Sequence, residues 1–202
     1  TALAGSKFKF VEALLALSVS LLLQIGVNYA NDYSDGIRGT DANRVGPIRI
    51  TASGLATPSS VKRAAFISFA LGASAGLALA AMTSWWLIAV GAAAILAAWG
   101  YTGGKNPYGY LGLGELFVFV FFGLVATVGT YFVQVEEITL DSILISIPMG
   151  TFSCALLAIN NVRDRALDAP AGKKTLAVRL GDRRARYFFT ALIVLGYIAA
   201  LS

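Results

Sequence analysis

The sequence has no histidine and only one cysteine, Cys154. Imidazole nitrogens and thiolates are the usual ligands of zinc, copper and haem iron, so the composition excludes the common sites for these groups. One cysteine cannot form an intrachain disulfide, and packing is the expected role of Cys154 within its apolar run. A metal bound by this chain would therefore have to use oxygen ligands.

Charged residues are also scarce, at 13% of the 202 residues, whereas a soluble domain carries about 25%. Hydrophobic residues make up 57% of the chain. The period-2 alternation that a membrane barrel needs is absent. Several apolar runs instead have the length, roughly 18 to 20 residues, that lets a helix cross the hydrocarbon layer of a bilayer. We therefore predict an all-α integral membrane protein.

Six transmembrane spans are predicted, within a single domain that covers residues 1–202. They lie at residues 10–30, 64–82, 85–101, 113–133, 142–160 and 187–202. The chain begins with Thr1 rather than Met, and its last apolar run stops inside a helical pattern. We therefore expect the domain to be trimmed at both ends.

The net charge of +5 could indicate a nucleic-acid partner, but the distribution of Lys and Arg argues against one. All sixteen lie outside the predicted spans, and most lie in two loops, 31–63 and 161–186. The alternate loops, 83–84 and 134–141, contain none. Because basic loops stay on the cytoplasmic side, we place loops 31–63, 102–112 and 161–186 there, in a multi-pass protein of the plasma membrane.

The two large basic loops each begin with a similar acidic motif. The first motif is Asn31-x-x-x-Asp35 followed by Asp41, with Asp32 beside it, and the second is Asn160-x-x-x-Asp164-x-x-x-Asp168. Residues three, four and seven positions apart share one face of a helix, so each motif forms a strip of oxygen ligands at a helix end. The alternative is that both strips are solvated helix-end groups.

The charge of these strips favours a cation site. Five of the eleven acidic residues of the chain lie in the two strips: Asp32, Asp35, Asp41, Asp164 and Asp168. Carboxylates that face each other need protons or cations between them. Mg²⁺ binds one or two carboxylates together with substrate phosphates, and Arg44, Lys105 and Lys173 are candidates to hold such a polyanion. The pattern is therefore typical of a site for a diphosphate leaving group.

Three segments together resemble a known family. "NDYSDGIRGTDANRVGP" and "NNVRDRALDAPAGKKTLAVRLG" are similar to the two aspartate-rich motifs of the UbiA superfamily of intramembrane prenyltransferases. Within this superfamily, the residues of both motifs are most similar to the menaquinone (MenA) branch, the 1,4-dihydroxy-2-naphthoate polyprenyltransferases. The same holds for the segment "YTGGKNPYGYLGLGELFVFVFFG". The resemblance implies a multi-helix bundle, of about nine spans in the family, around a central cavity.

The resemblance also implies an activity and a site. It implies transfer of a polyprenyl group from an allylic diphosphate to 1,4-dihydroxy-2-naphthoate, with decarboxylation and pyrophosphate release, to give demethylmenaquinone. Two Mg²⁺ ions are implied, with Asn31, Asp35 and Asp41 at one, Asn160, Asp164 and Asp168 at the other, and Asp32 adjoining the first. Asp35 and Asp164 would be catalytic, and Asn31 and Asn160 would also contact the diphosphate.

Glu115, at the start of the fourth predicted span, has two possible roles. A charge at this depth is costly and usually faces a cavity, which favours a catalytic role in acceptor binding or proton handling. Stabilisation of a helix N-terminus is the alternative. Tyr101, Tyr108 and Tyr110 could line an acceptor pocket or anchor the chain at the membrane interface.

Other functions are compatible with parts of this pattern. A divalent-cation transporter would use the acidic strips as a selectivity site, but it would also need acidic groups in mid-membrane. The same prenyl-transfer chemistry could act on 4-hydroxybenzoate, homogentisate, a chlorin or a phosphosugar. An assembly subunit without chemistry would have no use for two acidic strips. The prenyl chain length and the oligomeric state do not follow from the sequence.

Overall fold

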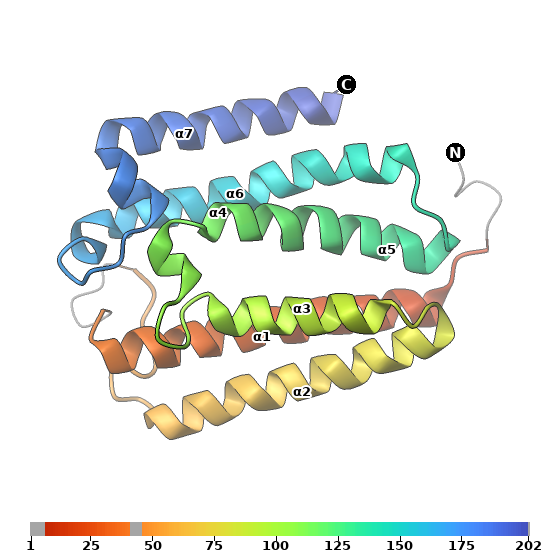
Figure 1. Ribbon diagram of the computed structural model, residues 1–202, viewed down its shortest axis with the longest axis horizontal. Coiled ribbons are helices and arrows are strands. Elements are labelled where there is room, and N and C mark those ends of the chain that lie inside the picture. The colour runs from red at the N-terminus through yellow and green to blue at the C-terminus, as the bar shows by residue number, and fades with distance from the viewer. Residues whose placement is uncertain (1–6, 41–45, 202) are drawn as a thin grey trace.

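The computed structural model describes residues 7–40 and 46–201, and every regular element among them is helical (Figure 1). The elements are α1 (Phe10–Arg38), α2 (Pro58–Met82), α3 (Leu87–Gly100), a 3₁₀ turn (Tyr108–Leu111), α4 (Gly114–Val118), a π-helical segment (Phe119–Val125), α5 (Ala126–Val135), α6 (Leu140–Asp168) and α7 (Leu176–Leu201). α4, the π-helical segment and α5 follow one another as a single helix. The predicted all-α fold is confirmed.

Five of the helices are long and apolar enough to cross a membrane: α1, α2, the continuous Gly114–Val135 helix, α6 and α7. α3 occupies the third predicted span, but its 14 residues are about 21 Å long, less than the ~30 Å hydrocarbon layer. The six predicted apolar segments are therefore all helices, and five have the length of a full span. The chain is a multi-pass membrane protein.

The helix ends are set by local chemistry as well as by hydropathy. Thr57 caps α2, since its side chain accepts a hydrogen bond from the backbone N–H of Ser60, and Pro58 takes the first helical position. Thr139 and Ser142 form a reciprocal capping box at the start of α6. α1 continues past its apolar part and ends where Gly39 adopts a left-handed conformation. The second strip and the described part of the first strip, residues 31–35, therefore lie on helices that extend beyond the apolar spans.

The helices run side by side in alternating directions, which sorts the connections to two ends (Figure 1). The α1–α2, α3–α4 and α6–α7 connections lie at one end, here called the loop end. The α2–α3 and α5–α6 connections lie at the other, together with the start of α1 and the end of α7. The three loops predicted to share one side of the membrane are thus at the same end of the bundle.

Two glycines allow α6 to approach the preceding span closely. A Cβ atom at Gly123 would lie 2.6 Å from the Cα of Gly150, and one at Gly150 would lie 2.7 Å from the ring of Phe119. Small residues let helix backbones meet in this way within membranes. The contact holds the Gly114–Val135 helix against α6, and so places Glu115 beside the second acidic strip.

Candidate active site at the loop end

Asp35 lies near the end of α1 and is the best-buried member of the first strip, with 2% of its side chain exposed. Both of its carboxylate oxygens are engaged by other segments. The Tyr110 hydroxyl donates to Oδ1 at 2.7 Å, and the Lys173 Nζ donates to Oδ2 at 3.1 Å. The contact brings together α1, the α3–α4 loop and the α6–α7 loop, which are far apart in sequence.

Tyr110 is held between two cations beside Asp35. The Arg38 guanidinium lies 5.2 Å from the centre of its ring, and the Lys173 Nζ lies 5.4 Å from it. The Tyr110 hydroxyl also hydrogen-bonds to the Thr40 hydroxyl at 3.0 Å. Burial raises the pKa of the Tyr110 phenol well above its usual value, and the Asp35 charge adds to the shift. Tyr110 is therefore a stable hydrogen-bond donor at neutral pH.

Arg38 and Asn31 fix the α3–α4 loop to the end of α1. Arg38 donates to the carbonyl oxygens of Thr102 and Gly104, the latter at 2.5 Å. The Thr102 hydroxyl, which is fully buried, donates to Asn31 Oδ1 at 2.7 Å. Asn31, a predicted ligand of the first metal and of the diphosphate, thus lies at the loop end as expected, with its oxygen in a contact between elements.

Asp32 anchors the second half of the α1–α2 connection. Its Oδ2 accepts a hydrogen bond from the backbone N–H of Ile50 and its Oδ1 accepts one from Thr51, each at 2.8 Å. The side chain is 4% exposed. A buried carboxylate that accepts two backbone amides has an evident role in folding this loop. The metal-binding role predicted for Asp32 stays a prediction beside it.

The second strip lies on the last turns of α6 and makes a different set of contacts. Arg163 forms a two-pronged ion pair with the adjacent Asp164, at 2.7 and 2.8 Å. Asp168 is 5% exposed, and Asn160 is half-buried. A Cβ atom at Gly46 would lie 3.3 Å from the Arg163 guanidinium carbon, so the loop that follows the first strip lies against this residue.

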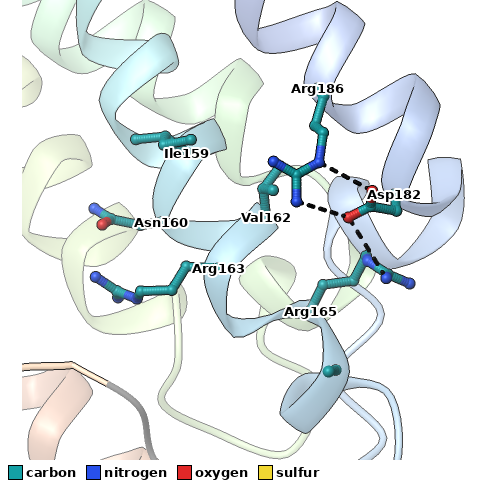
Figure 2. A pocket seen from close by; sticks show the side chains of 8 residues that line it. Ile159, Asn160, Val162, Arg163, Arg165, Asp182 and Arg186 are labelled. Carbon is teal, nitrogen blue, oxygen red and sulfur yellow. Dashed lines mark hydrogen bonds and ion pairs between the residues drawn. The ribbon is translucent and has the colours of Figure 1, made fainter.

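A pocket of about 420 Å³ opens beside the second strip, between α6 and the part of α7 that follows Gly181 (Figure 2). It is lined by Ile159, Asn160, Val162, Arg163, Arg165, Ala166, Asp182 and Arg186. Figure 2 shows that Arg186 and Arg165 converge on Asp182, at 2.9 and 3.7 Å, whereas Asn160 and Arg163 point away from them on α6. The lining is cationic overall, with an apolar wall from α6.

Glu115 lies below the two strips and is 7% exposed. Its Oε1 accepts a hydrogen bond from Asn161 Nδ2 at 3.0 Å, which ties the start of α4 to the second strip. The Cys154 thiol donates to the Glu115 backbone oxygen at 3.0 Å. Glu115 Oε2 is buried and has no hydrogen-bond partner among the residues that the structure describes. A buried carboxylate oxygen without a partner is costly, so this atom is available to a ligand or a proton.

The structure brings only some of the predicted site residues into contact with one another. Asp35 and Lys173 are in direct contact, and Asn31, Asp32, Asn160, Asp164, Asp168 and Glu115 lie at or near the loop end. Lys105 is exposed and makes no hydrogen bond or ion pair within ranges 7–40 and 46–201. Asp41 and Arg44 fall outside the described residues.

The sequence did not assign several residues that turn out to complete the site. Arg38, Thr40 and Thr102 were not singled out, and Tyr110 was weighed only as a pocket or interface residue. Asn161 stands beside Asn160 in the second motif, and its spacing to Asp164 was the available signal. Only tertiary contacts show that Asn161 binds Glu115 and that Tyr110 binds Asp35.

The side-chain oxygens of the two strips are ligands of the type that Mg²⁺ binds. Carboxylate and amide oxygens, without nitrogen or sulfur ligands, are the set that this ion prefers. Within the described residues no group of three or more acidic, His or Cys side chains lies close enough to hold a metal by itself. A substrate diphosphate would supply further oxygen ligands to such an ion.

Comparison with known proteins agrees with this picture. The whole chain, residues 1–202, matches the UbiA prenyltransferase family. It is 57% identical to a 1,4-dihydroxy-2-naphthoate octaprenyltransferase of Mycobacterium tuberculosis, over 90% of this chain and 62% of the relative. The enzymes of the same description from Mycobacterium leprae and Escherichia coli are 51% and 40% identical, over 91% and 93% of this chain. The chain spans 62 to 63% of the length of these three relatives. No solved structure matches it.

Proposed function

The chain belongs to the UbiA prenyltransferase family, and from this premise we propose that it transfers a polyprenyl group from an allylic diphosphate to 1,4-dihydroxy-2-naphthoate. The similarity to three enzymes described by that acceptor supports the choice of acceptor. The observation that carries the proposal is the buried Asp35, set among Lys173, Arg38 and Tyr110 at the polar end of an apolar bundle.

The diphosphate binds at the loop end, between the two acidic strips. When bound, two Mg²⁺ ions would supply the positive charge that neutralises the diphosphate leaving group. The ligands proposed for the ions are Asn31, Asp32, Asp35, Asp41, Asn160, Asp164 and Asp168. Lys173, Arg44 and Lys105 are proposed to hold the remaining phosphate oxygens. Such fixed charges favour the bond-breaking step because negative charge grows on the leaving group.

The acceptor binds nearer the membrane interior, beside Glu115. The ring carbon that carries the carboxylate forms a C–C bond to the allylic carbon, the bond to the carboxylate breaks, and CO₂ leaves with pyrophosphate. The product is demethylmenaquinone in its quinol form. Glu115 Oε2, which has no hydrogen-bond partner among the described residues, would accept a hydrogen bond from a naphthoate hydroxyl and so orient the ring. The polyprenyl tail lies along the apolar helices, within the lipid.

The orientation follows from charge. The loop end carries the basic α1–α2, α3–α4 and α6–α7 connections, so it faces the cytoplasm if the protein lies in the plasma membrane. Water-soluble naphthoate and Mg²⁺ would then reach the site from the cytoplasm, and the lipid-soluble diphosphate would enter from the bilayer.

The acceptor is tested by competition. Detergent-purified full-length protein is incubated with Mg²⁺, geranylgeranyl diphosphate and equal amounts of dihydroxynaphthoate, 4-hydroxybenzoate and homogentisate, and the product masses are measured. We expect one product, the prenylated naphthol that has lost CO₂. A prenylated product of another acceptor would refute the naphthoate assignment and keep the prenyl transfer. Absence of product and of released pyrophosphate from folded protein would refute both.

The metal requirement is tested separately. EDTA should abolish pyrophosphate release, and added Mg²⁺ should restore it. The double variant Asp35→Asn with Asp164→Asn should stay inactive at any Mg²⁺ concentration. Full activity in EDTA, or in the double variant, would contradict the proposed site.

A further inference from the structure

We propose that Lys173 is an exchangeable counter-ion, which neutralises Asp35 in the resting protein and must leave it before the carboxylate can bind a divalent cation. The inference rests on the proposed function, because it concerns the same diphosphate site. It adds a regulatory contact. Lys173 competes with the divalent cation for Asp35, and once the cation has displaced it, Lys173 can bind the phosphates of the substrate.

Both carboxylate oxygens of Asp35 are occupied by hydrogen-bond donors. One oxygen accepts from Tyr110 and the other accepts from Lys173, and 2% of the side chain is exposed. A carboxylate this well buried needs a compensating positive charge, because its desolvation is otherwise very costly. Lys173, with 12% of its side chain exposed, supplies that charge from the α6–α7 loop. A metal ion would also supply a compensating positive charge, so the Lys173 ammonium and the metal ion exclude one another at Asp35 Oδ2.

Of the two partners of Asp35, Tyr110 is held more firmly than Lys173. Tyr110 belongs to the 3₁₀ turn, and its backbone oxygen accepts a hydrogen bond from the Lys174 N–H. Its ring lies against Arg38, and its hydroxyl also contacts Thr40. The Lys173 side chain has fewer contacts: besides its ion pair with Asp35, its Nζ lies 5.4 Å from the centre of the Tyr110 ring. Lys173 follows Gly172, which adopts a left-handed conformation in the short 169–175 loop, and its Nζ has no second ion-pair partner among the described residues.

Release of Lys173 from Asp35 couples the binding of the divalent cation to the binding of the diphosphate. A lysine ammonium has three N–H donors, and Lys173 would offer all of them to a phosphate once it leaves Asp35. Cation binding and diphosphate binding then favour each other, because each removes the cost of separating Lys173 from Asp35. The free protein should therefore bind divalent cations weakly, and loss of the Lys173 charge should strengthen that binding.

Direct metal binding tests the inference without relying on catalysis. Mn²⁺ is titrated into metal-free, full-length protein without substrate, and free Mn²⁺ is followed by its electron paramagnetic resonance signal. Lys173→Met should bind Mn²⁺ about tenfold more tightly than the wild type, a typical size for coupling between sites. Lys173→Arg keeps the positive charge and should stay weak. Lys174→Met is the matched control, since Lys174 is the exposed neighbour, and it should behave as the wild type.

Thermal unfolding in EDTA and in Mn²⁺ gives a second readout. Lys173→Met should unfold at a lower temperature than the wild type in EDTA, and Mn²⁺ should raise its midpoint more than that of the wild type. If Lys173→Met does not fold, Lys173→Gln, which keeps a hydrogen-bond donor without the charge, takes its place. Equal Mn²⁺ affinity in the wild type and the uncharged variants would overturn the counter-ion role alone. No Mn²⁺ binding by any of them would also overturn the counter-ion role, and no Mn²⁺ binding even with added pyrophosphate would refute the metal site, and with it the proposed function.

Discussion

The two acidic strips look like copies in the sequence, but the structure uses them differently. The strip on α1 is bound by segments from elsewhere in the chain: Asp32 holds residues 50 and 51, and Asp35 holds Tyr110 and Lys173. On α6, Asp164 pairs with the adjacent Arg163, and Asn161, next to Asn160, hydrogen-bonds to a distant residue, Glu115.

This difference in contacts predicts that the carboxylates of the two strips contribute unequally to the stability of the fold, although both are needed for activity. A carboxylate that joins several loops contributes to folding as well as to any metal it binds, whereas one that pairs with its neighbour contributes little to the tertiary structure. Loss of the first strip should therefore unfold the loop end and remove activity together. Loss of the less buried Asp164, in the second strip, should remove activity at a smaller cost in stability than loss of Asp35.

The largest expected effect is that of Asp35→Asn compared with Asp164→Asn. Asp35→Asn leaves the Lys173 ammonium buried without its partner, so we expect a loss of about 3 kcal/mol of unfolding free energy. Asp164→Asn should change stability less, because 16% of the Asp164 side chain is exposed, against 2% for Asp35. Thermal unfolding of both variants in EDTA measures this. Equal midpoints would remove the distinction between the strips.

The next effect concerns Asp32. Asp32→Ala removes the acceptor for two backbone N–H groups, and we expect a cost of about 2 kcal/mol. Limited proteolysis should then cut the 46–57 segment faster than in the wild type, and Asp32→Asn, which keeps one acceptor oxygen, should be intermediate. Asn160→Ala, in the second strip, is the control. If Asp32→Ala leaves cleavage unchanged but weakens Mn²⁺ binding, its metal role outweighs the loop contact.

A smaller effect is expected where the second strip does reach across the bundle. Asn161→Asp replaces the amide that donates to Glu115 with a second carboxylate, which should cost about 1 to 2 kcal/mol through repulsion and the lost hydrogen bond. Adding Glu115→Gln restores a donor and an acceptor in reversed order, so the double variant should recover most of the stability. Failure of the double variant to recover would argue against a direct contact. Unfolding midpoints of the four proteins complete the cycle.

The smallest effect is expected at the rim of the pocket in Figure 2. Arg186 and Asp182 form an exposed pair one helical turn apart, and such pairs add little stability. Arg186→Ala should leave the unfolding midpoint unchanged within error. A clear drop would mean that the charges of this pocket support the fold in the way that those around Asp35 do.

The sequence anticipated the helices better than their ends. Hydropathy located all six apolar helices because it measures which segments favour lipid over water. It placed the end of the first span at residue 30, whereas α1 continues to Arg38. It started the last span at residue 187, whereas α7 begins at Leu176 and is kinked at Gly181, whose backbone is not helical. Helices extend past the hydrocarbon where caps and tertiary contacts satisfy their polar ends, and hydropathy does not measure either.

What the sequence determined by itself was the membrane class, the helical fold and the two strips with their oxygen chemistry, because each depends on residue type and on spacing along one helix. Tertiary structure decided which strip is buried and which partners each carboxylate has. Lys173 lies 138 residues from Asp35, and Asn161 lies 46 residues from Glu115. No local pattern encodes such pairs, because they depend on how the helices bring the loop-end segments together.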